Sequence, residues 1–388
     1  MKAKGYIKRT IKLLSLFVVV VFLFFFLQQF FFSNADNNAA RLQGFYLEDK
    51  DSIDVVFLGA SEGYYDLAPG YAYDRYGITS YSYGTPSTTI RNYKTMLKEI
   101  LRTQNPKIIF VELNGAYYDK DDLYSDIHLR NYTDHLPLNA NKVELINKCV
   151  EGDKLEYYFP LVKFHAVWRN YPSGLGWTIS LLENRFRGYS PLKGIRAKAE
   201  MPRFGTTNMI HGEELNAKLP LEKESEQELR DFLQYCKDEK VNVVFGRMPH
   251  IVQKVNLARF QRSNTAKEIV ESYGFDFICF DVNDTDTELD INHDFFNQEH
   301  LNVYGQQKVT DIFTRYLIDH YNLEPSSLTE SQQKEWKDCA RYYYAYFDYA
   351  EYKYNHGETD YVCEDYRNMK MIKKFLTPLD EFELSFTK

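Results

Sequence analysis

Three polar side chains stand at the ends of patterned segments and have the chemistry of an acyl-transfer site. Ser61 follows a strand-like segment, Asn114 follows another, and His300 precedes a helical one. A serine hydroxyl is a poor nucleophile near neutral pH unless a base takes its proton, and histidine is the side chain that most often does so. A carboxamide can donate a hydrogen bond to the oxyanion that forms. These residue types predict a serine nucleophile with a histidine base.

The segments that position these residues alternate between strand-like and helix-like patterns. Short apolar runs predict strands at residues 53–58, 78–83, 107–113, 241–245 and 275–280. Helical spacing of apolar residues predicts helices at 89–103, 225–240, 256–273 and 304–321. Ser225 and Glu228 fit a capping box at the start of the second helix. Apolar strands separated by helices indicate a parallel sheet covered by helices on both faces, with binding sites beyond the carboxyl ends of its strands.

Other side chains at the same predicted edge are candidates for binding. Gly84 follows the second strand, and Arg247 and His250 follow the fourth. Arg247 is a candidate for binding an anionic group of a substrate, whereas His250 is interpreted as a structural histidine. Tyr64 and Tyr65 stand beside the serine, where they either line a sugar-binding cleft or pack in the core.

Two segments lie outside the alternating pattern. The connection at about 115–222 is too long for a simple crossover between strands, so we predict an insertion there. Residues 326–388 are predicted to form a C-terminal helical extension, with tyrosines crowded on a helix at 330–361. Those rings either pack on the domain or offer a surface that stacks on carbohydrate. The remaining residues, 36–325, are predicted to be one α/β domain.

An apolar run of 20 residues, 13–32, precedes this domain. A helix of this length spans about 30 Å, the thickness of a bilayer core. Lysines and an arginine precede the run and no acidic residue does, so the positive-inside rule places the N-terminus in the cytoplasm and the main domain outside the cell. Ser33-Asn34-Ala35 would also suit a signal peptidase. The length of the run favours an uncleaved single-pass anchor, with its cytoplasmic tip, over residues 1–35.

The charge of the chain argues against a nucleic-acid partner. The net charge is -8, and residues 36–388 hold 42 basic against 55 acidic residues. Proteins that bind nucleic acid need a basic excess to neutralise phosphates. Aromatic residues make up 16% of the chain, and together these two features favour a sugar substrate over a nucleic acid.

The order of the motifs resembles that of the SGNH/GDSL hydrolase superfamily over residues 51–115 and 240–321. In that family the nucleophilic serine follows the first strand in a Gly-x-Ser turn, here Gly59-Ala60-Ser61. The resemblance implies a three-layer, flavodoxin-like α/β fold. It also implies that the amides of Ser61 and Gly84 and the side chain of Asn114 bind the oxyanion.

The resemblance assigns His300 as the base, but the position of the family's acid, three residues earlier, is Asn297. An asparagine can orient an imidazole but cannot stabilise the imidazolium by charge, and in serine proteases the equivalent loss costs roughly 10⁴ in rate. Asp294 is nearby in the sequence and is the alternative acid. Without it, Ser61 and His300 form a slow dyad, or the domain binds without catalysing.

The segments Val55 to Ser61, Tyr76 to Gly84, Asn105 to Lys107 and His300 to Lys308 are similar to the membrane-anchored Gram-positive branch of this superfamily. The resemblance implies an extracytoplasmic serine esterase or O-acyltransferase that acts on acyl groups, acetyl in the simplest case, of a cell-surface polysaccharide. Its expected partners are that glycan, the lipid bilayer through residues 13–32, and a membrane-bound O-acyltransferase. We expect no cofactor and no metal site. The alternative is a catalytically weakened member that binds glycan or scaffolds a membrane polysaccharide complex.

Overall fold

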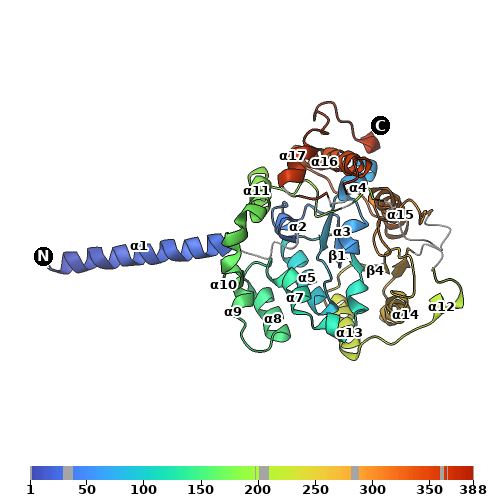
Figure 1. Ribbon diagram of the computed structural model, residues 1–388, viewed down its shortest axis with the longest axis horizontal. Coiled ribbons are helices and arrows are strands. Elements are labelled where there is room, and N and C mark those ends of the chain that lie inside the picture. The colour runs from blue at the N-terminus through green and yellow to red at the C-terminus, as the bar shows by residue number, and fades with distance from the viewer. Residues whose placement is uncertain are drawn as a thin grey trace.

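A parallel sheet of five strands forms the centre of the molecule (Figure 1). The computed structural model describes residues 2–28, 38–196, 198–200, 209–280, 288–358, 362–364 and 366–387. The strands are β1 (Val55–Gly59), β2 (Ser80–Gly84), β3 (Ile108–Glu112), β4 (Val243–Arg247) and β5 (Phe277–Cys279). Their order across the sheet is β2-β1-β3-β4-β5, and every neighbouring pair is parallel. The fold is therefore α/β, as the alternating segments predicted.

Helices precede, separate and follow the strands. Before β3 the chain forms α1 (Lys2–Gln28), α2 (Asn38–Phe45), α3 (Glu62–Tyr65), α4 (Pro69–Tyr76) and α5 (Ile90–Thr103). Between β3 and β4 it forms η1 (Asn114–Ala116), α6 (Lys120–Leu123), α7 (Asp126–Thr133), α8 (Ala140–Cys149), α9 (Leu155–Tyr158), α10 (Pro160–Phe164), η2 (His165–Asn170), α11 (Tyr171–Arg187), α12 (Glu213–Asn216) and α13 (Lys223–Asp238). The last helices are α14 (Leu257–Ser272), α15 (Val303–Tyr321), α16 (Glu330–Asn355), α17 (Tyr366–Ile372) and η5 (Ser385–Thr387).

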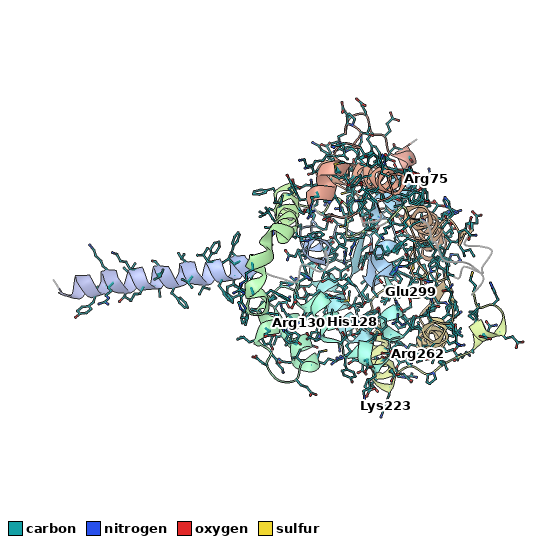
Figure 2. The ribbon with its side chains drawn as sticks, viewed as in Figure 1. Arg75, His128, Arg130, Lys223, Arg262 and Glu299 are labelled. Carbon is teal, nitrogen blue, oxygen red and sulfur yellow. The ribbon has the colours of Figure 1, made fainter. Side chains whose placement is uncertain are left out.

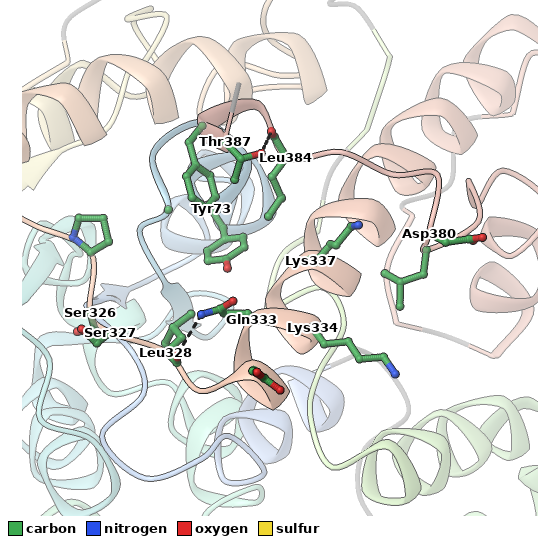
Figure 3. A pocket seen from close by; sticks show the side chains of 15 residues that line it. Tyr73, Ser326, Ser327, Leu328, Gln333, Lys334, Lys337, Asp380, Leu384 and Thr387 are labelled. Carbon is green, nitrogen blue, oxygen red and sulfur yellow. Dashed lines mark hydrogen bonds between the residues drawn. The ribbon is translucent and has the colours of Figure 1, made fainter.

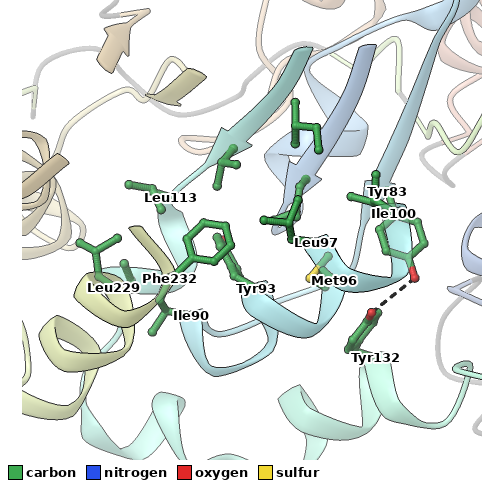
Figure 4. Packing of buried hydrophobic residues seen from close by; sticks show 14 of the residues in the cluster. Tyr83, Ile90, Tyr93, Met96, Leu97, Ile100, Leu113, Tyr132, Leu229 and Phe232 are labelled. Carbon is green, nitrogen blue, oxygen red and sulfur yellow. Dashed lines mark hydrogen bonds between the residues drawn. The ribbon is translucent and has the colours of Figure 1, made fainter. Parts of the chain in front are cut away.

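Successive residues of each strand bury on opposite faces of the sheet. In β1, Val56 belongs to a core shared with α5 and α13, whereas Phe57 belongs to a core shared with α15. Figure 4 shows the first core, in which Tyr93 of α5 meets Phe232 of α13 edge to face, with ring centroids 6.0 Å apart. Helices thus cover both faces, which explains why β1, β3 and β4 are mostly apolar.

The five predicted strands and four predicted helices are confirmed, with ends that differ by at most two residues. The predicted capping box is wrong. Helix α13 begins at Lys223, after the extended Glu222, and no side chain caps its first turn. Ser225 is already inside the helix, where its side chain faces the core and its hydroxyl has no hydrogen-bond partner in the described structure.

The tyrosine-rich helix α16 packs on α4. The two backbones approach so closely at Gly70 that a Cβ there would lie 2.5 Å from the Cβ of Tyr343. Most of the tyrosines of this helix are buried, although Tyr352 and Tyr354 are 39% and 37% exposed. The rings therefore serve mainly to attach α16 to the domain, which was one of the two alternatives that the sequence left open.

Helix α1 projects away from the sheet domain (Figure 1). Its segment Gly5–Gln28 is long and apolar enough to cross a membrane, and none of its most apolar stretch is buried. The last four residues of the predicted span, 29–32, lie outside the described residues. An N-terminal apolar helix of membrane-spanning length is therefore confirmed.

Candidate active site

The fold brings Ser61 and Asn114 to one point on the carboxyl edge of the sheet. Ser61 follows β1 and precedes α3, and Asn114 opens η1 just after β3. Strands β1 and β3 are neighbours, while β2 lies on the other side of β1. The chain therefore changes direction across the sheet between β1 and β3, and open α/β sheets form their binding crevice at such a switch point. His300 reaches the same edge from the segment before α15, whose first turn is capped by the Asn302 side chain.

A chain of hydrogen bonds joins Ser61, His300 and Asn297. Ser61 Oγ lies 2.7 Å from His300 Nε2, and His300 Nδ1 lies 3.0 Å from Asn297 Oδ1. Because a carboxamide oxygen only accepts, Nδ1 carries the proton and Nε2 presents its lone pair to the Ser61 hydroxyl. The backbone amide of Glu299 donates to the same Asn297 oxygen at 2.9 Å, which keeps that oxygen facing the ring. This is the tautomer in which His300 can act as a base.

Two aromatic rings enclose the imidazole of His300. Phe296 stacks on it, with centroids 5.4 Å apart and planes at 7°, and Tyr65 meets it edge to face at 4.8 Å. Burial lowers the pKa of His300 to about 4, although the negative charge of Glu62 acts in the opposite direction. The imidazole is consequently neutral near pH 7, which is the form that accepts a proton from the serine.

Glu62, directly after the serine, is a fully buried carboxylate that the sequence analysis did not assign. Ser61 Oγ lies 3.4 Å from its Oε2, while its Oε1 accepts from Asn114 Nδ2 at 2.5 Å and lies 3.2 Å from His250 Nε2. Burial raises the pKa of Glu62, but the hydrogen bond and charge of His250 and the charge of His300 outweigh it, so the pKa lies below its ordinary value. A negative charge therefore stands beside the nucleophile.

The predicted oxyanion donors surround the turn after β1. Gly84 pairs with Gly59 in the sheet. A Cβ on Gly84 would lie 2.8 Å from the carbonyl oxygen of Ala60, a steric clash that only glycine avoids. The Asn114 side chain has two N–H groups, of which Glu62 engages one, so the second can serve another acceptor. That Ser61, Gly84 and Asn114 hold an oxyanion stays a prediction.

Glu112, at the end of β3, ties the two turns of the site together. Its side chain accepts a hydrogen bond from the Ala60 amide at 3.0 Å and another from the Asn114 amide. Burial raises the pKa of Glu112 well above its ordinary value, and the charge of Glu62 raises it further. This one side chain fixes Ser61 and Asn114 relative to each other.

The Asp294 carboxylate does not lie beside the imidazole of His300. Its carboxylate contacts Lys308 Nζ at 2.8 Å and His293 Nδ1 at 2.7 Å, and it also accepts from the Asp290 amide at 2.7 Å. The position beside His300 Nδ1 is taken by Asn297 instead. In the described structure, Asp294 therefore holds the loop before α15 rather than the imidazole of His300.

The three candidate binding residues are buried. Arg247 donates to Ser263 Oγ at 2.7 Å and to Asn264 Oδ1 at 2.6 Å, both on α14. Tyr64 and Tyr65 are only 2% and 5% exposed, and their rings contact each other. Their burial favours the packing alternative for the tyrosines, with Tyr65 supporting the base.

A cavity of about 900 Å³ lies away from these residues, between α16, the C-terminal tail and the end of α4 (Figure 3). Ser326, which lines it, bonds to Asp54 just before β1, so this cavity is at the amino edge of the sheet. Within the described residues, no group of three or more His, Cys, Asp or Glu side chains is arranged to hold a metal ion.

The fold and the site together define an α/β protein with a Ser–His–Asn chain of hydrogen bonds at the carboxyl edge of a parallel sheet. Comparisons with protein-family models, with curated proteins and with solved structures found no match to this chain.

Sequence reasoning missed Glu62 and Glu112 and interpreted His250 as structural. One signal for Glu62 was present, since an acidic residue directly after the candidate nucleophile has a short reach to it. The pairing of Glu62 with His250 joins residues 188 positions apart, and no local pattern reports such a contact.

Proposed function

We propose that this protein is an extracytoplasmic serine esterase or O-acyltransferase of the SGNH type, acting on acyl groups of a cell-surface polysaccharide. The observation that carries the proposal is the hydrogen-bonded chain from Ser61 through His300 to Asn297. The strand order supports the flavodoxin-like version of the α/β fold. The position of the site at the switch point of the sheet also supports the flavodoxin-like fold.

In the proposed reaction, Ser61 Oγ attacks the acyl carbonyl carbon while His300 Nε2 takes the hydroxyl proton. The negative charge that forms on the carbonyl oxygen is held by the amides of Ser61 and Gly84 and by Asn114. His300 then returns the proton to the leaving sugar hydroxyl, and the acyl group stays on Ser61. In the second half, His300 takes a proton from water or another sugar hydroxyl, whose oxygen attacks the acyl carbon of the acyl-serine. The bond from that carbon to Ser61 Oγ then breaks, His300 returns the proton to Oγ, and the carboxylic acid or the acylated sugar leaves.

The location of the reaction follows from the N-terminal helix. The cations before the apolar run support a cytoplasmic N-terminus and an exported domain. The acidic surface of residues 36–388 suits a neutral glycan better than a polyanion. A membrane-bound O-acyltransferase would be a suitable partner, because it could deliver acyl groups across the bilayer to Ser61.

The test is the substitution Ser61→Ala in the purified full-length protein. Wild type is expected to hydrolyse an aryl acetate and to be labelled covalently by a fluorophosphonate, and Ser61→Ala is expected to lose both. Ser80→Ala is the matched control, because Ser80 is buried in β2 and its hydroxyl has no hydrogen-bond partner in the described structure. Undiminished turnover in Ser61→Ala would refute the serine mechanism.

One observation favours a second function. The residue beside His300 Nδ1 is a neutral asparagine, which orients the ring but adds no charge to stabilise an imidazolium. A catalytically weakened protein that binds glycan or scaffolds a polysaccharide complex would show no fluorophosphonate labelling of Ser61, together with measurable binding of an oligosaccharide. Strong labelling of Ser61 would decide for the enzyme.

A further inference from the structure

The last turns of α1 rest on the insertion between β3 and β4. The rings of Phe24 and Phe25 meet Phe159 with centroids 5.5 Å and 6.3 Å apart. One turn further, the Gln28 side chain lies 3.5 Å from the carbonyl oxygen of Tyr158, to which it donates. Figure 1 shows α9, α10 and α11 as the elements nearest to this end of α1. The C-terminal end of α1 therefore lies against the insertion.

Large apolar side chains are exposed on these elements and on the segment just before α8. The residues are Leu138, Leu155, Val162 and Phe186, with exposed fractions of 44%, 50%, 37% and 88%. Each lies within three residues of one that contacts α1 or lines the cavity beside it. A surface of this kind marks an interaction site when it is contiguous. The adjoining helix α1, which is long and apolar enough to cross a membrane, points to a bilayer as the covering partner.

A cavity of about 690 Å³ opens beside the end of α1. Phe25 and Gln28 line one side of it, and the insertion lines another. Three cationic side chains, Arg102, Lys142 and Arg185, are among its described lining residues. The lining also includes apolar residues of α1 and of the insertion, such as Phe25, Leu136 and Pro160, so the cavity combines apolar with cationic side chains.

Asp134 is the acidic residue among the described lining residues of this cavity. Burial raises the pKa of Asp134 to about 7, although Arg130 and Lys142 act against this. Burial also lowers the pKa of Lys142 to about 8, and its ammonium donates to the Leu136 carbonyl. Arg102 is paired with the buried Glu99 at 2.9 Å, so the positive charge of the cavity near neutral pH comes from Arg185 and Lys142.

We propose that the face formed by α9, α10 and the C-terminal end of α11 lies on the bilayer, and that the cavity beside α1 binds the anionic headgroup of a bilayer lipid. The lipid phosphate would meet Arg185, while the start of its chains would pack against Phe25 and Pro160. Basic and apolar side chains in this combination are typical of surfaces that lie in a membrane interface. The proposal rests on α1 crossing a membrane and is independent of the chemistry at Ser61.

The contact with the bilayer is tested with full-length protein in nanodiscs of phosphatidylcholine with brominated chains. Phe186→Trp places a new fluorophore on the proposed face. Phe386→Trp is the matched control, because Phe386 is 44% exposed beside the C-terminus, which Figure 1 shows away from α1. The added fluorescence at position 186 should be quenched by brominated lipid and that at 386 should not. Equal quenching at the two positions would refute the contact.

The headgroup site is tested by native mass spectrometry of the full-length protein in detergent, titrated with phosphatidylglycerol and with phosphatidylcholine. Wild type should retain phosphatidylglycerol in preference. Arg185→Gln should weaken that binding about fivefold, since one cation near an anionic lipid contributes about 1 kcal/mol. Lys223→Gln removes an exposed cation of α13 that Figure 2 places away from α1, and it should change nothing. No preference for phosphatidylglycerol, or equal losses in the two variants, would overturn the site.

Discussion

The most informative perturbation of the site is Asn297→Asp. It replaces the carboxamide beside His300 by a carboxylate of nearly the same shape, 3.0 Å from His300 Nδ1. If the proposed base is correct, the imidazolium that forms in the transition state gains an opposite charge within hydrogen-bond reach. We therefore expect kcat/KM for ester hydrolysis to rise.

The size of the gain follows from what the asparagine already does. Replacing the aspartate of a serine protease by asparagine costs roughly 10⁴, largely because the imidazole adopts the wrong tautomer. Here the Glu299 amide holds Asn297 Oδ1 toward the ring, so the tautomer is already the productive one. Only the charge is missing. Two unit charges about 4 Å apart interact by about 4 kcal/mol near a protein surface, or about 10³ in rate. Desolvation of the new carboxylate reduces this, so we expect a gain of about 10- to 10³-fold.

The assay is the pH dependence of kcat/KM with a soluble aryl acetate. The neutral imidazole is the active form of the base, so activity falls as pH decreases through the pKa of His300. Burial places that pKa at about 4 in the wild type. A carboxylate at 297 favours the protonated ring, so the acid limb should move up toward the ordinary histidine value of about 6.5.

The matched control is Gln298→Glu, which makes the same chemical change one residue away. The Gln298 side chain is directed at Gln253 rather than at the imidazole. It should leave both the rate and the acid limb unchanged. An upward shift of the acid limb in Asn297→Asp without any gain in rate would show that His300 titrates but does not take the proton of the nucleophile. That result would refute the proposed mechanism.

Two further substitutions test the separate roles of the Glu62 and Asp294 carboxylates. Glu62→Gln removes the charge beside Ser61 and His300, so kcat/KM should fall about tenfold or more, and the acid limb of the same pH profile should move to lower pH. An unchanged limb would mean that Glu62 acts only through packing. Asp294→Asn weakens the contact of the buried Asp294 carboxylate with the exposed Lys308, so it should lower the free energy of unfolding by about 1–3 kcal/mol in denaturant titrations, while kcat per labelled Ser61 stays constant. A large loss of kcat in Asp294→Asn, with Ser61 still fully labelled, would mean that Asp294 takes part in catalysis.

Most of the sheet could be predicted because its signals are local. Residues 53–58 and 108–111 are apolar at almost every position, which is typical of a strand buried on both faces. The helix at 304–321 shows helical spacing and is preceded by Asn302, whose side chain caps it. The start of α13 could not be predicted in the same way. Ser225 and Glu228 have the residue types and the spacing of a capping box, but the helix begins two residues earlier, at Lys223.

The site could be predicted only where each residue stands at the end of an element. Ser61 and Asn114 follow neighbouring parallel strands, so topology alone brings them together. His300 is carried to them by the helix that follows it. Asp294 and Asn297 illustrate the limit, since both precede His300 by a few residues and only the loop conformation decides which one faces the ring. That conformation depends on Lys308 and on the Glu299 amide, which sequence spacing does not report.

The asparagine beside the base and the glutamate beside the nucleophile belong to one electrostatic arrangement. Three buried carboxyl groups, Glu62, Asp66 and Glu112, stand close enough to affect one another's pKa. Burial and the charge of Glu62 raise the pKa values of the other two, so Glu62 carries the negative charge of the group. A fourth carboxylate at position 297 would compete with Glu62 for the same imidazolium of His300. Because Asn297 is neutral, the imidazolium of His300 interacts with the negative charge of Glu62 on the side of Ser61. Asn297→Asp should therefore raise kcat/KM by a larger factor in the Glu62→Gln background than in the wild type. Equal gains in the two backgrounds would mean that the two positions act independently.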